Sequence, residues 1–229
     1  MVLIFSIEGN IGSGKSTLVN LLNKNILSID NKTVVFIQEP VDIWNSIKDK
    51  NGTTILEKFY ENQEKYAFSF QMMAYISRIH ILKETMKKYP HSIIITERSV
   101  CTDKNVFAKM LYDDNKIEEI NYQIYNKWFE EFIKDIPLTG IIYITTTPEK
   151  SLERIKIRNR KGEQIPIKYL QKCHEYHNNW LYKDKRPVLI LDGNIEFKNL
   201  TSPWYNKIIH FIAKFIPKID INTFDVSYC

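Results

Sequence analysis

Near its N-terminus the chain reads Gly9-Asn10-Ile11-Gly12-Ser13-Gly14-Lys15-Ser16-Thr17. The stretch fits the pattern G-x-x-x-x-G-K-[ST], in which glycines let backbone N–H groups turn inward around an anion. Lys15 can then reach the outer phosphates of a nucleoside triphosphate, and the Ser16 hydroxyl can hold the Mg²⁺ that bridges them. The pattern predicts a phosphate-binding loop, called a P-loop. We assign these loop residues to cofactor binding: Gly9, Asn10, Gly12, Ser13, Gly14, Lys15, Ser16 and Thr17.

The residues on either side of the loop support this interpretation over a chance glycine turn. Residues 2–7 form a short apolar run that predicts a buried strand, and residues 16–25 place leucines at helical spacing. A strand, a glycine loop and a helix in this order bring a helix N-terminus against a phosphate. We therefore expect the chain to bind a nucleoside triphosphate.

The composition is that of a globular protein. Of the 229 residues, 44% are hydrophobic, and the net charge of +5 comes from lysines scattered along the chain, so we expect no nucleic-acid partner. No stretch approaches the ~20 apolar residues that cross a bilayer, and the first apolar run lacks the charged region of a signal peptide. The three cysteines are odd in number and far apart, which favours reduced thiols. We therefore expect a cytoplasmic protein with no membrane partner.

Strand and helix patterns alternate along the chain. Apolar runs predict five strands, at residues 2–7, 33–38, 91–96, 140–144 and 187–191. Helical periodicity covers residues 54–88 with a break near residue 62, then 103–112, 118–134, a stretch from about 149, 167–184 and 204–215. Apolar strands that alternate with helices predict a parallel sheet covered on both faces. We expect an α/β fold of the P-loop NTPase type, with a five-stranded parallel sheet, in a single domain spanning residues 1–229.

Polar residues follow two of the predicted strands. Glu39 comes after the second strand, and Glu97-Arg98 ends the third. In a parallel α/β sheet ligands bind outside the carboxyl ends of the strands, so these side chains are candidates for a site shared with the P-loop. Either carboxylate could instead cap a helix or form a structural ion pair with an arginine.

Taken together, these motifs resemble the deoxyribonucleoside kinases of the deoxycytidine, deoxyguanosine and mitochondrial thymidine kinase type. The resemblance extends over nearly the whole chain, to Leu191-Asp192. It rests on motifs that occur in the family's order: the P-loop, Glu39-Pro40-Val41 with Trp44, Phe70-Gln71, Glu97-Arg98-Ser99, and the arginines before Ile165-Pro166.

The resemblance implies transfer of a phosphoryl group from ATP, with Mg²⁺, to the 5′-hydroxyl of a deoxyribonucleoside. In this interpretation Glu39 is the general base and Arg98 orients it and meets the phosphoryl oxygens, where a planar guanidinium fits. Lys15 is the third catalytic residue, and Glu97 helps Ser16 to hold Mg²⁺. Phosphoryl transfer depends mostly on positioning and charge neutralisation, which these residue types can supply.

The resemblance also implies an arginine-rich lid at about residues 154–165 that closes over the ATP phosphates. It assigns Arg154, Arg158 and Arg160 to the cofactor, together with Phe197. Arg154 and Arg158 are four residues apart and share a helix face, although cations near a helix C-terminus also favour the helix dipole. Glu163 corresponds to a lid carboxylate that contacts the sugar 3′-hydroxyl, although the lid is one residue shorter here than in the family.

The nucleoside is expected to lie between aromatic and polar side chains. Gln71 and Arg78 are seven residues apart, so both point the same way from one helix. From spacing alone the aromatic residues indicate core packing. The resemblance assigns the following residues to the substrate: Glu39, Trp44, Leu56, Phe59, Tyr60, Phe70, Gln71, Ala74, Arg78, Arg98, Asp103, Phe107 and Glu163.

Asp103, Arg78 and Ala74 indicate which base is preferred. An ionised carboxylate accepts hydrogen bonds only, so it suits an exocyclic amine and repels a carbonyl oxygen. Arg78 can pair with Asp103 and keep it ionised. Relatives that prefer thymidine tend to replace the charged pair and enlarge Ala74. We therefore expect deoxycytidine, deoxyadenosine or deoxyguanosine to be preferred over thymidine.

Other functions remain to be weighed against this one. A thymidine-preferring kinase of the same family and thymidylate kinase are the nearest alternatives, but thymidylate kinases usually continue Glu-Pro with glycines and use Asp-Arg-Tyr. A GTPase switch needs Asn-Lys-x-Asp, which residues 31–34 do not provide.

The resemblance implies a homodimer built on helices, with the helix at 118–134 as a candidate. Cys173, His174 and His177 lack the ligands of a zinc site, and we expect them on a solvated helix face.

Overall fold

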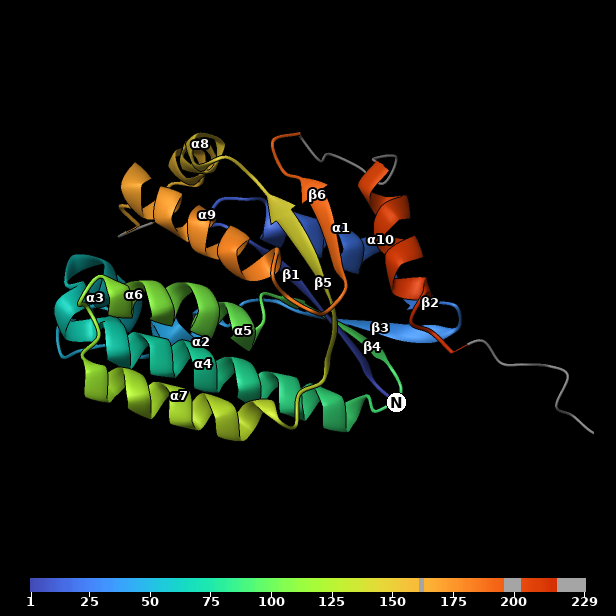
Figure 1. Cartoon of the computed structure of the whole chain (residues 1–229), viewed down its shortest axis with the longest axis horizontal. Coiled ribbons are helices and arrows are strands. Elements are labelled where there is room, and N and C mark those ends of the chain that lie inside the picture. The colour runs from blue at the N-terminus through green and yellow to red at the C-terminus, as the bar shows by residue number, and fades with distance from the viewer. Residues whose placement is uncertain (161–162, 196–202, 218–229) are drawn as a thin grey trace, which may run out of the picture.

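In a computed structural model, which describes residues 1–160, 163–195 and 203–217, the chain forms a twisted sheet between helices (Figure 1). The strands are β1 (Leu3–Gly9), β2 (Ser28–Ile29), β3 (Lys32–Ile37), β4 (Ile93–Glu97), β5 (Leu138–Thr145) and β6 (Val188–Asp192). Their order in the sheet is β2-β3-β4-β1-β5-β6. The four pairs from β3 to β6 are all parallel. The P-loop strand β1 is the central one of these five parallel strands.

The sheet has six strands rather than the five expected from the sequence. The additional strand, β2, is only two residues long and pairs antiparallel with β3. Asp30 and Asn31 connect the two strands, both with positive φ angles of 46° and 63°. This is the backbone of a tight two-residue hairpin turn, which asparagine and aspartate tolerate better than most residues. A strand of two residues is too short to produce a hydrophobic period, so the pattern missed it.

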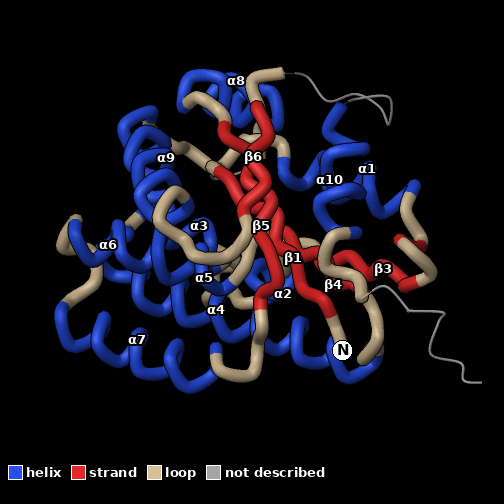
Figure 2. The backbone as a smooth tube through the Cα atoms, turned by 45° about the vertical axis from the view of Figure 1, so that its right-hand side comes forward, coloured by secondary structure: helices blue, strands red, loops and turns tan. Residues whose placement is uncertain are grey.

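Helices cover both faces of the sheet (Figure 2). They are α1 (Lys15–Asn25), α2 (Val41–Ser46), α3 (Ile55–Glu61), α4 (Gln63–Lys88), α5 (Val100–Thr102), the π-helix η1 (Asp103–Ala108), α6 (Lys109–Asp113), α7 (Glu119–Ile133), α8 (Pro148–Arg158), α9 (Ile167–Leu181) and α10 (Pro203–Ala213). The predicted break near Asn62 is present, because Asn62 ends α3 and its side chain accepts a hydrogen bond from the N–H of Lys65 at the start of α4. No helix among the described residues has the length and apolarity needed to cross a membrane.

Two hydrophobic clusters fix the layers. Side chains alternate along β1, so Phe5 and Ile7 pack with α1 and α10, whereas Ile4 packs with α4 and α7. Figure 2 shows α1 and α10 on one side of the sheet and α4, α7 and α9 on the other. All seven residues of β1 are buried, including the polar Ser6 and Glu8. The P-loop therefore begins at the end of a central strand that is buried along its whole length.

Two helical segments differ from the expectation. The short helix α2 follows Glu39-Pro40 and was not predicted, because its six residues are fewer than two turns. The helix expected at residues 103–112 begins earlier, at Val100, and contains the π-helical turn η1. Such turns occur frequently at functional sites, because they change the direction in which neighbouring side chains point. Here Asp103 and Phe107 both lie in the π-helical turn and both line a cavity.

Candidate active site

The P-loop joins the end of β1 to the start of α1. Gly9, Gly12 and Gly14 have φ angles of 148°, 77° and 98°, which residues with a Cβ rarely adopt. Gly9 also has no space for a side chain, since an added Cβ would lie 2.6 Å from the Ile144 carbonyl oxygen of β5. The loop thus follows its path because glycine permits both the conformation and the close packing.

Lys15 lies under this loop and is buried. Its Nζ donates to the Asn10 carbonyl at 2.6 Å and to the Ser13 hydroxyl at 3.3 Å. Burial and the nearby Arg98 lower the pKa of Lys15 to about 7, although three carboxylates act in the opposite direction. Negative phosphates next to Lys15 would favour its charged ammonium form. We therefore expect the binding of an anion to raise the pKa of Lys15.

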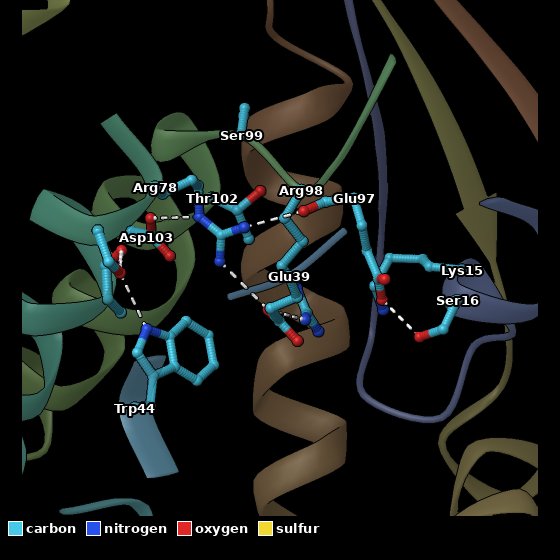
Figure 3. A network of polar contacts seen from close by, with 12 residues as sticks. Lys15, Ser16, Glu39, Trp44, Arg78, Glu97, Arg98, Ser99, Thr102 and Asp103 are labelled. Carbon is cyan, nitrogen blue, oxygen red and sulfur yellow. Dashed lines mark hydrogen bonds and ion pairs between the residues drawn. The ribbon is translucent and has the colours of Figure 1, made fainter. Parts of the chain in front are cut away.

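Glu39 lies at the carboxyl end of β3 and is held by two arginines. Arg98 Nη1 lies 2.7 Å from Glu39 Oε1, and Arg78 Nη2 lies 3.2 Å from the same oxygen. Burial disfavours the ionised carboxylate, but Arg98, Arg78 and Lys15 outweigh it and lower the pKa of Glu39 to about 2. Figure 3 shows Glu39 between the P-loop side, marked by Lys15 and Ser16, and the opposite side, marked by Trp44 and Asp103.

Arg98 is held in an unusual backbone conformation. Its φ of 60° lies in the left-handed region, which costs free energy for a residue other than glycine and is found at functional sites. The Arg98 N–H donates to the Ile7 carbonyl of β1 at 3.0 Å. Its guanidinium carbon lies 5.2 Å from the ring centroid of Phe107, within cation–π distance. From this turn the Arg98 guanidinium reaches Glu39.

Ser16 and Glu97 provide oxygen atoms on the phosphate side. The Ser16 hydroxyl donates to Glu97 Oε1 at 2.6 Å, so the two predicted metal ligands are already adjacent. Within the described ranges no group of three or more histidine, cysteine or acidic side chains is arranged to hold a metal ion. One hydroxyl and one carboxylate nevertheless fit Mg²⁺, which usually keeps several waters and takes its remaining ligands from phosphates.

The opposite side of the cavity carries polar groups suited to a base. Arg78 Nε lies 3.0 Å from Asp103 Oδ2, as the sequence predicted, and Arg78 Nη1 also donates to the Glu97 carbonyl at 2.8 Å. Burial raises the pKa of Asp103 to about 6 against the effect of Arg78. Gln71 is 2% exposed, and its Oε1 has no hydrogen-bond partner among the described residues. A buried polar atom without a partner is rare, and here it faces a space that a ligand can enter.

Aromatic side chains form the walls beside these groups. Phe59 stacks on Phe70 with ring centroids 4.7 Å apart, and Trp44 meets Phe70 edge-on at 5.4 Å. Trp44 Nε1 donates to the Ser77 hydroxyl at 2.9 Å, which fixes its ring. Together the P-loop, the charged cluster and these walls enclose one cavity of about 610 Å³. That volume is typical of sites for small-molecule ligands.

The segment predicted as a lid borders the same cavity. Arg154 Nη1, on α8, donates to the Ser13 carbonyl of the P-loop at 3.3 Å. Arg158 Nη2 binds both carboxylate oxygens of Glu163 at 2.7 and 2.6 Å, and Arg160 lies 4.0 Å from the same carboxylate. Arg158, which was assigned to the ATP phosphates, and Glu163, which was assigned to the sugar, thus form an ion pair with each other.

The cavity brings nearly all of the predicted site residues together. It is lined by Gly12, Ser13, Gly14, Lys15, Ser16, Thr17, Glu39, Trp44, Leu56, Phe59, Tyr60, Phe70, Gln71, Ala74, Arg78, Glu97, Arg98, Asp103, Phe107, Arg154, Arg158, Arg160 and Glu163. Gly9 and Asn10 do not line it but shape the loop beneath, and Phe197 lies outside the described residues. The sequence did not single out these further lining residues: Ile11, Ile157, Tyr169, Gly193, Ile195 and Trp204. Of these, Tyr169 follows Ile165-Pro166 closely enough for the lid motif to have indicated it.

The expectation for Cys173 and His177 is wrong. Both are buried rather than solvated, and Cys173 is a free thiol packed against Val106, Phe107 and Met110. The His177 Nδ1 lies 2.6 Å from the Cys173 carbonyl, and burial lowers the pKa of this imidazole to about 3. The sequence pattern gave the wrong prediction because this face of α9, although it carries a polar residue, packs against η1 and β5.

Comparison with known proteins decides the family. The family model described as deoxynucleoside kinase matches residues 5–217. This chain belongs to the deoxynucleoside kinase family. It is 34% identical to rat (Rattus norvegicus) deoxycytidine kinase, over 91% of this chain and 90% of the relative. It is 35% identical to a probable deoxycytidine kinase of fowlpox virus, over 91% and 88%, and 32% identical to the mitochondrial deoxyguanosine kinase of Xenopus laevis, over 85% and 82%. As a member of this family the protein is an enzyme, a deoxynucleoside kinase.

The close packing of the P-loop on β5 generates a prediction about this deoxynucleoside kinase. Gly9→Ala should lower the free energy of unfolding by about 1–3 kcal/mol and weaken ATP binding, because both the φ angle and the Ile144 carbonyl oppose a Cβ. Gly52→Ala is the matched control, because Gly52 has a φ of 82° but no atom near its Cβ position. Chemical denaturation and calorimetric ATP titration measure both effects. Equal losses in the two variants would show that backbone strain alone is responsible.

Proposed function

We propose that this enzyme transfers a phosphoryl group from ATP, with Mg²⁺, to the 5′-hydroxyl of a deoxyribonucleoside, and that residues 1–229 form one kinase domain that acts in the cytoplasm. The observation that carries the proposal is the place of Glu39. Its carboxylate is fixed by Arg98 and Arg78 in one cavity, between the P-loop and the residues suited to a base. A nucleoside whose base lay against Gln71 would bring its sugar toward this carboxylate.

Glu39 is the proposed general base. With its pKa at about 2 the carboxylate is ionised at neutral pH and can accept a hydrogen bond from the 5′-hydroxyl. So acidic a carboxylate is a weak base. That is sufficient in a loose transition state, in which the hydroxyl proton transfers to Glu39 only as the oxygen–phosphorus bond forms.

Cations around the P-loop would stabilise the transferring group. Lys15 and Arg98 are buried and line the cavity, so they can neutralise phosphoryl oxygens away from bulk water. Ser16 and Glu97 would hold Mg²⁺, which would neutralise part of the negative charge of the phosphoryl donor. Arg158 would exchange Glu163 for the phosphates of ATP, which would release that carboxylate for the sugar 3′-hydroxyl.

Replacing Glu39 tests the proposal directly. Glu39→Gln should lower kcat by about 10²–10⁴-fold and leave the affinity for the nucleoside within a few-fold, because the amide keeps the shape but cannot take the proton. Glu84→Gln is the control, since Glu84 is an exposed carboxylate near the C-terminus of α4. Steady-state turnover and calorimetric nucleoside binding separate the two quantities. Near-normal turnover at saturating substrates would exclude Glu39 as the base.

We further propose that deoxycytidine, deoxyadenosine and deoxyguanosine are preferred over thymidine. Asp103 accepts hydrogen bonds from an exocyclic amine, and Arg78 keeps it aimed. Ala74 is buried beside them and leaves room for the charged pair. Arg78 also contacts Glu39, so a change at Arg78 would alter phosphoryl transfer as well as base choice. Asp103 is the cleaner position at which to test the preference.

The pH dependence of kcat/KM should reveal Asp103. For deoxycytidine, kcat/KM should fall as the pH decreases through about 6, because protonation removes the negative acceptor. Asp103→Asn should abolish this acidic limb and reduce the preference for deoxycytidine over thymidine. Thymidine, which lacks the amine, is the control substrate for the wild-type enzyme. If thymidine proved the best wild-type substrate, the base preference would be wrong while the kinase activity would stand.

The outer face of α7 supports the proposal of a homodimer. Ile120, Ile124 and Trp128 lie four residues apart and are 71%, 41% and 48% exposed, so they form one apolar stripe. Helix α4 runs beside α7 (Figure 1), and Tyr75 ties the two together by donating to the Trp128 carbonyl at 2.8 Å. Exposed apolar stripes of this kind are typical of interfaces between subunits.

Charged residues on this stripe should separate the subunits. Ile124→Glu with Trp128→Glu should convert the dimer into a monomer, since the stripe would no longer be covered by its copy. Leu27→Glu, at a residue that is 81% exposed but distant from α7, should leave the dimer intact. Analytical ultracentrifugation of the three proteins gives the answer. A wild-type monomer, or a dimer unaffected by the double change, would contradict this interface.

A further inference from the structure

Glu8 is a buried carboxylate to which the sequence assigned no role. It lies on β1 immediately before the P-loop and is 0% exposed. Its Oε1 accepts hydrogen bonds from the Ser99 N–H at 2.9 Å and the Ser99 hydroxyl at 2.6 Å, and its Oε2 accepts one from the Thr102 hydroxyl. These three donors are all neutral. Burial of a carboxylate is unfavourable, and neutral donors compensate it less well than a cation would.

The residues that Glu8 binds frame the active-site turn. Ser99 directly follows Arg98, and Thr102 directly precedes Asp103. Ser99 precedes the short helix α5 and Thr102 ends it, and Figure 3 shows both residues near Arg98 and Asp103. One carboxylate on the P-loop strand therefore holds the backbone between a proposed catalytic arginine and a proposed base-binding aspartate.

The same contacts explain how Arg98 keeps its left-handed conformation. The Arg98 N–H is bound by the Ile7 carbonyl at 3.0 Å, and the N–H of the next residue is bound by Glu8. Two successive residues of β1 thus fix the two peptide groups on either side of Arg98. With both groups fixed, the guanidinium reaches Glu39 at 2.7 Å and the Gly9 carbonyl at 3.5 Å.

We propose that Glu8 is a positioning residue for phosphoryl transfer, which acts through Ser99 and Thr102 to hold Arg98 against Glu39. The proposal rests on the function proposed above, in which Arg98 orients the base and meets the phosphoryl group. Glu8 does not line the cavity. Its effect should therefore appear in kcat rather than in the KM of either substrate.

Two variants remove parts of this contact with little change in shape. Glu8→Gln keeps one acceptor oxygen for Ser99 but loses the charge, and Thr102→Val keeps the volume but loses the hydroxyl. Each should lower kcat about tenfold, with the KM values for ATP and nucleoside changed by about twofold or less. Thr139→Val is the control, because the Thr139 hydroxyl binds β1 at its other end by accepting from the Ile4 N–H at 3.0 Å. That variant should lower the melting temperature and leave kcat unchanged.

A double-mutant cycle with Arg98 separates positioning from a general loss of stability. In an Arg98→Ala background, Glu8→Gln should change kcat by less than about twofold, because the residue that it positions is gone. A full tenfold effect in that background, or wild-type kcat in both single variants, would overturn the proposal. Thr102→Val provides the same cycle if Glu8→Gln does not fold.

A crystal structure of each variant gives a readout that does not depend on activity. Loss of the contact to Glu8 should separate the Arg98 guanidinium from Glu39, and an unchanged ion pair would contradict the proposal. If the wild-type enzyme phosphorylated no deoxyribonucleoside, the proposed function would be wrong. The variant structures would still decide whether Glu8 holds Arg98.

Discussion

The ion pairs of Glu39 with Arg98 and Arg78 are the interaction on which the site depends. The two arginines are buried, and each reaches the same carboxylate oxygen from a different element, Arg98 from the end of β4 and Arg78 from α4. Buried charges require partners, because isolated charges lose their hydration without compensation. The mutual requirement fixes the ends of β3 and β4 and the middle of α4 relative to one another.

Arg78 links base recognition to phosphoryl transfer. Its Nε donates to Asp103, its Nη2 to Glu39 and its Nη1 to the Glu97 carbonyl. A change in the hydrogen bonds of Asp103 would therefore reach the proposed general base through one guanidinium. Such shared partners make the effects of substitutions non-additive, so the base preference and the rate cannot be altered independently at this residue.

The P-loop strand β1 supplies more than the loop itself. Its buried side chains and carbonyls support Arg98 through Ile7, Gly9 and Glu8, while Gly9 allows the loop to pack against β5. A strand that is central in the sheet and buried along its whole length can hold strained geometry, because its neighbours leave it no alternative position. This explains how a non-glycine residue with positive φ persists at the centre of the site.

The sequence determined the elements whose signals are local. Apolar runs located the five parallel strands, and the glycine pattern located the P-loop. The polar residues after the strands pointed to Glu39, Glu97 and Arg98, and the family resemblance assigned most of the other residues that line the cavity. Short elements such as β2 and α2 gave no period to detect, and burial of Cys173 and His177 depended on which face of α9 meets η1. The contacts of Glu8 with Ser99 and Thr102, the dual role of Arg78 and the pairing of Arg158 with Glu163 followed from folding. They depend on the distances and orientations of side chains from different elements or from a loop, and no local pattern in a sequence records those quantities.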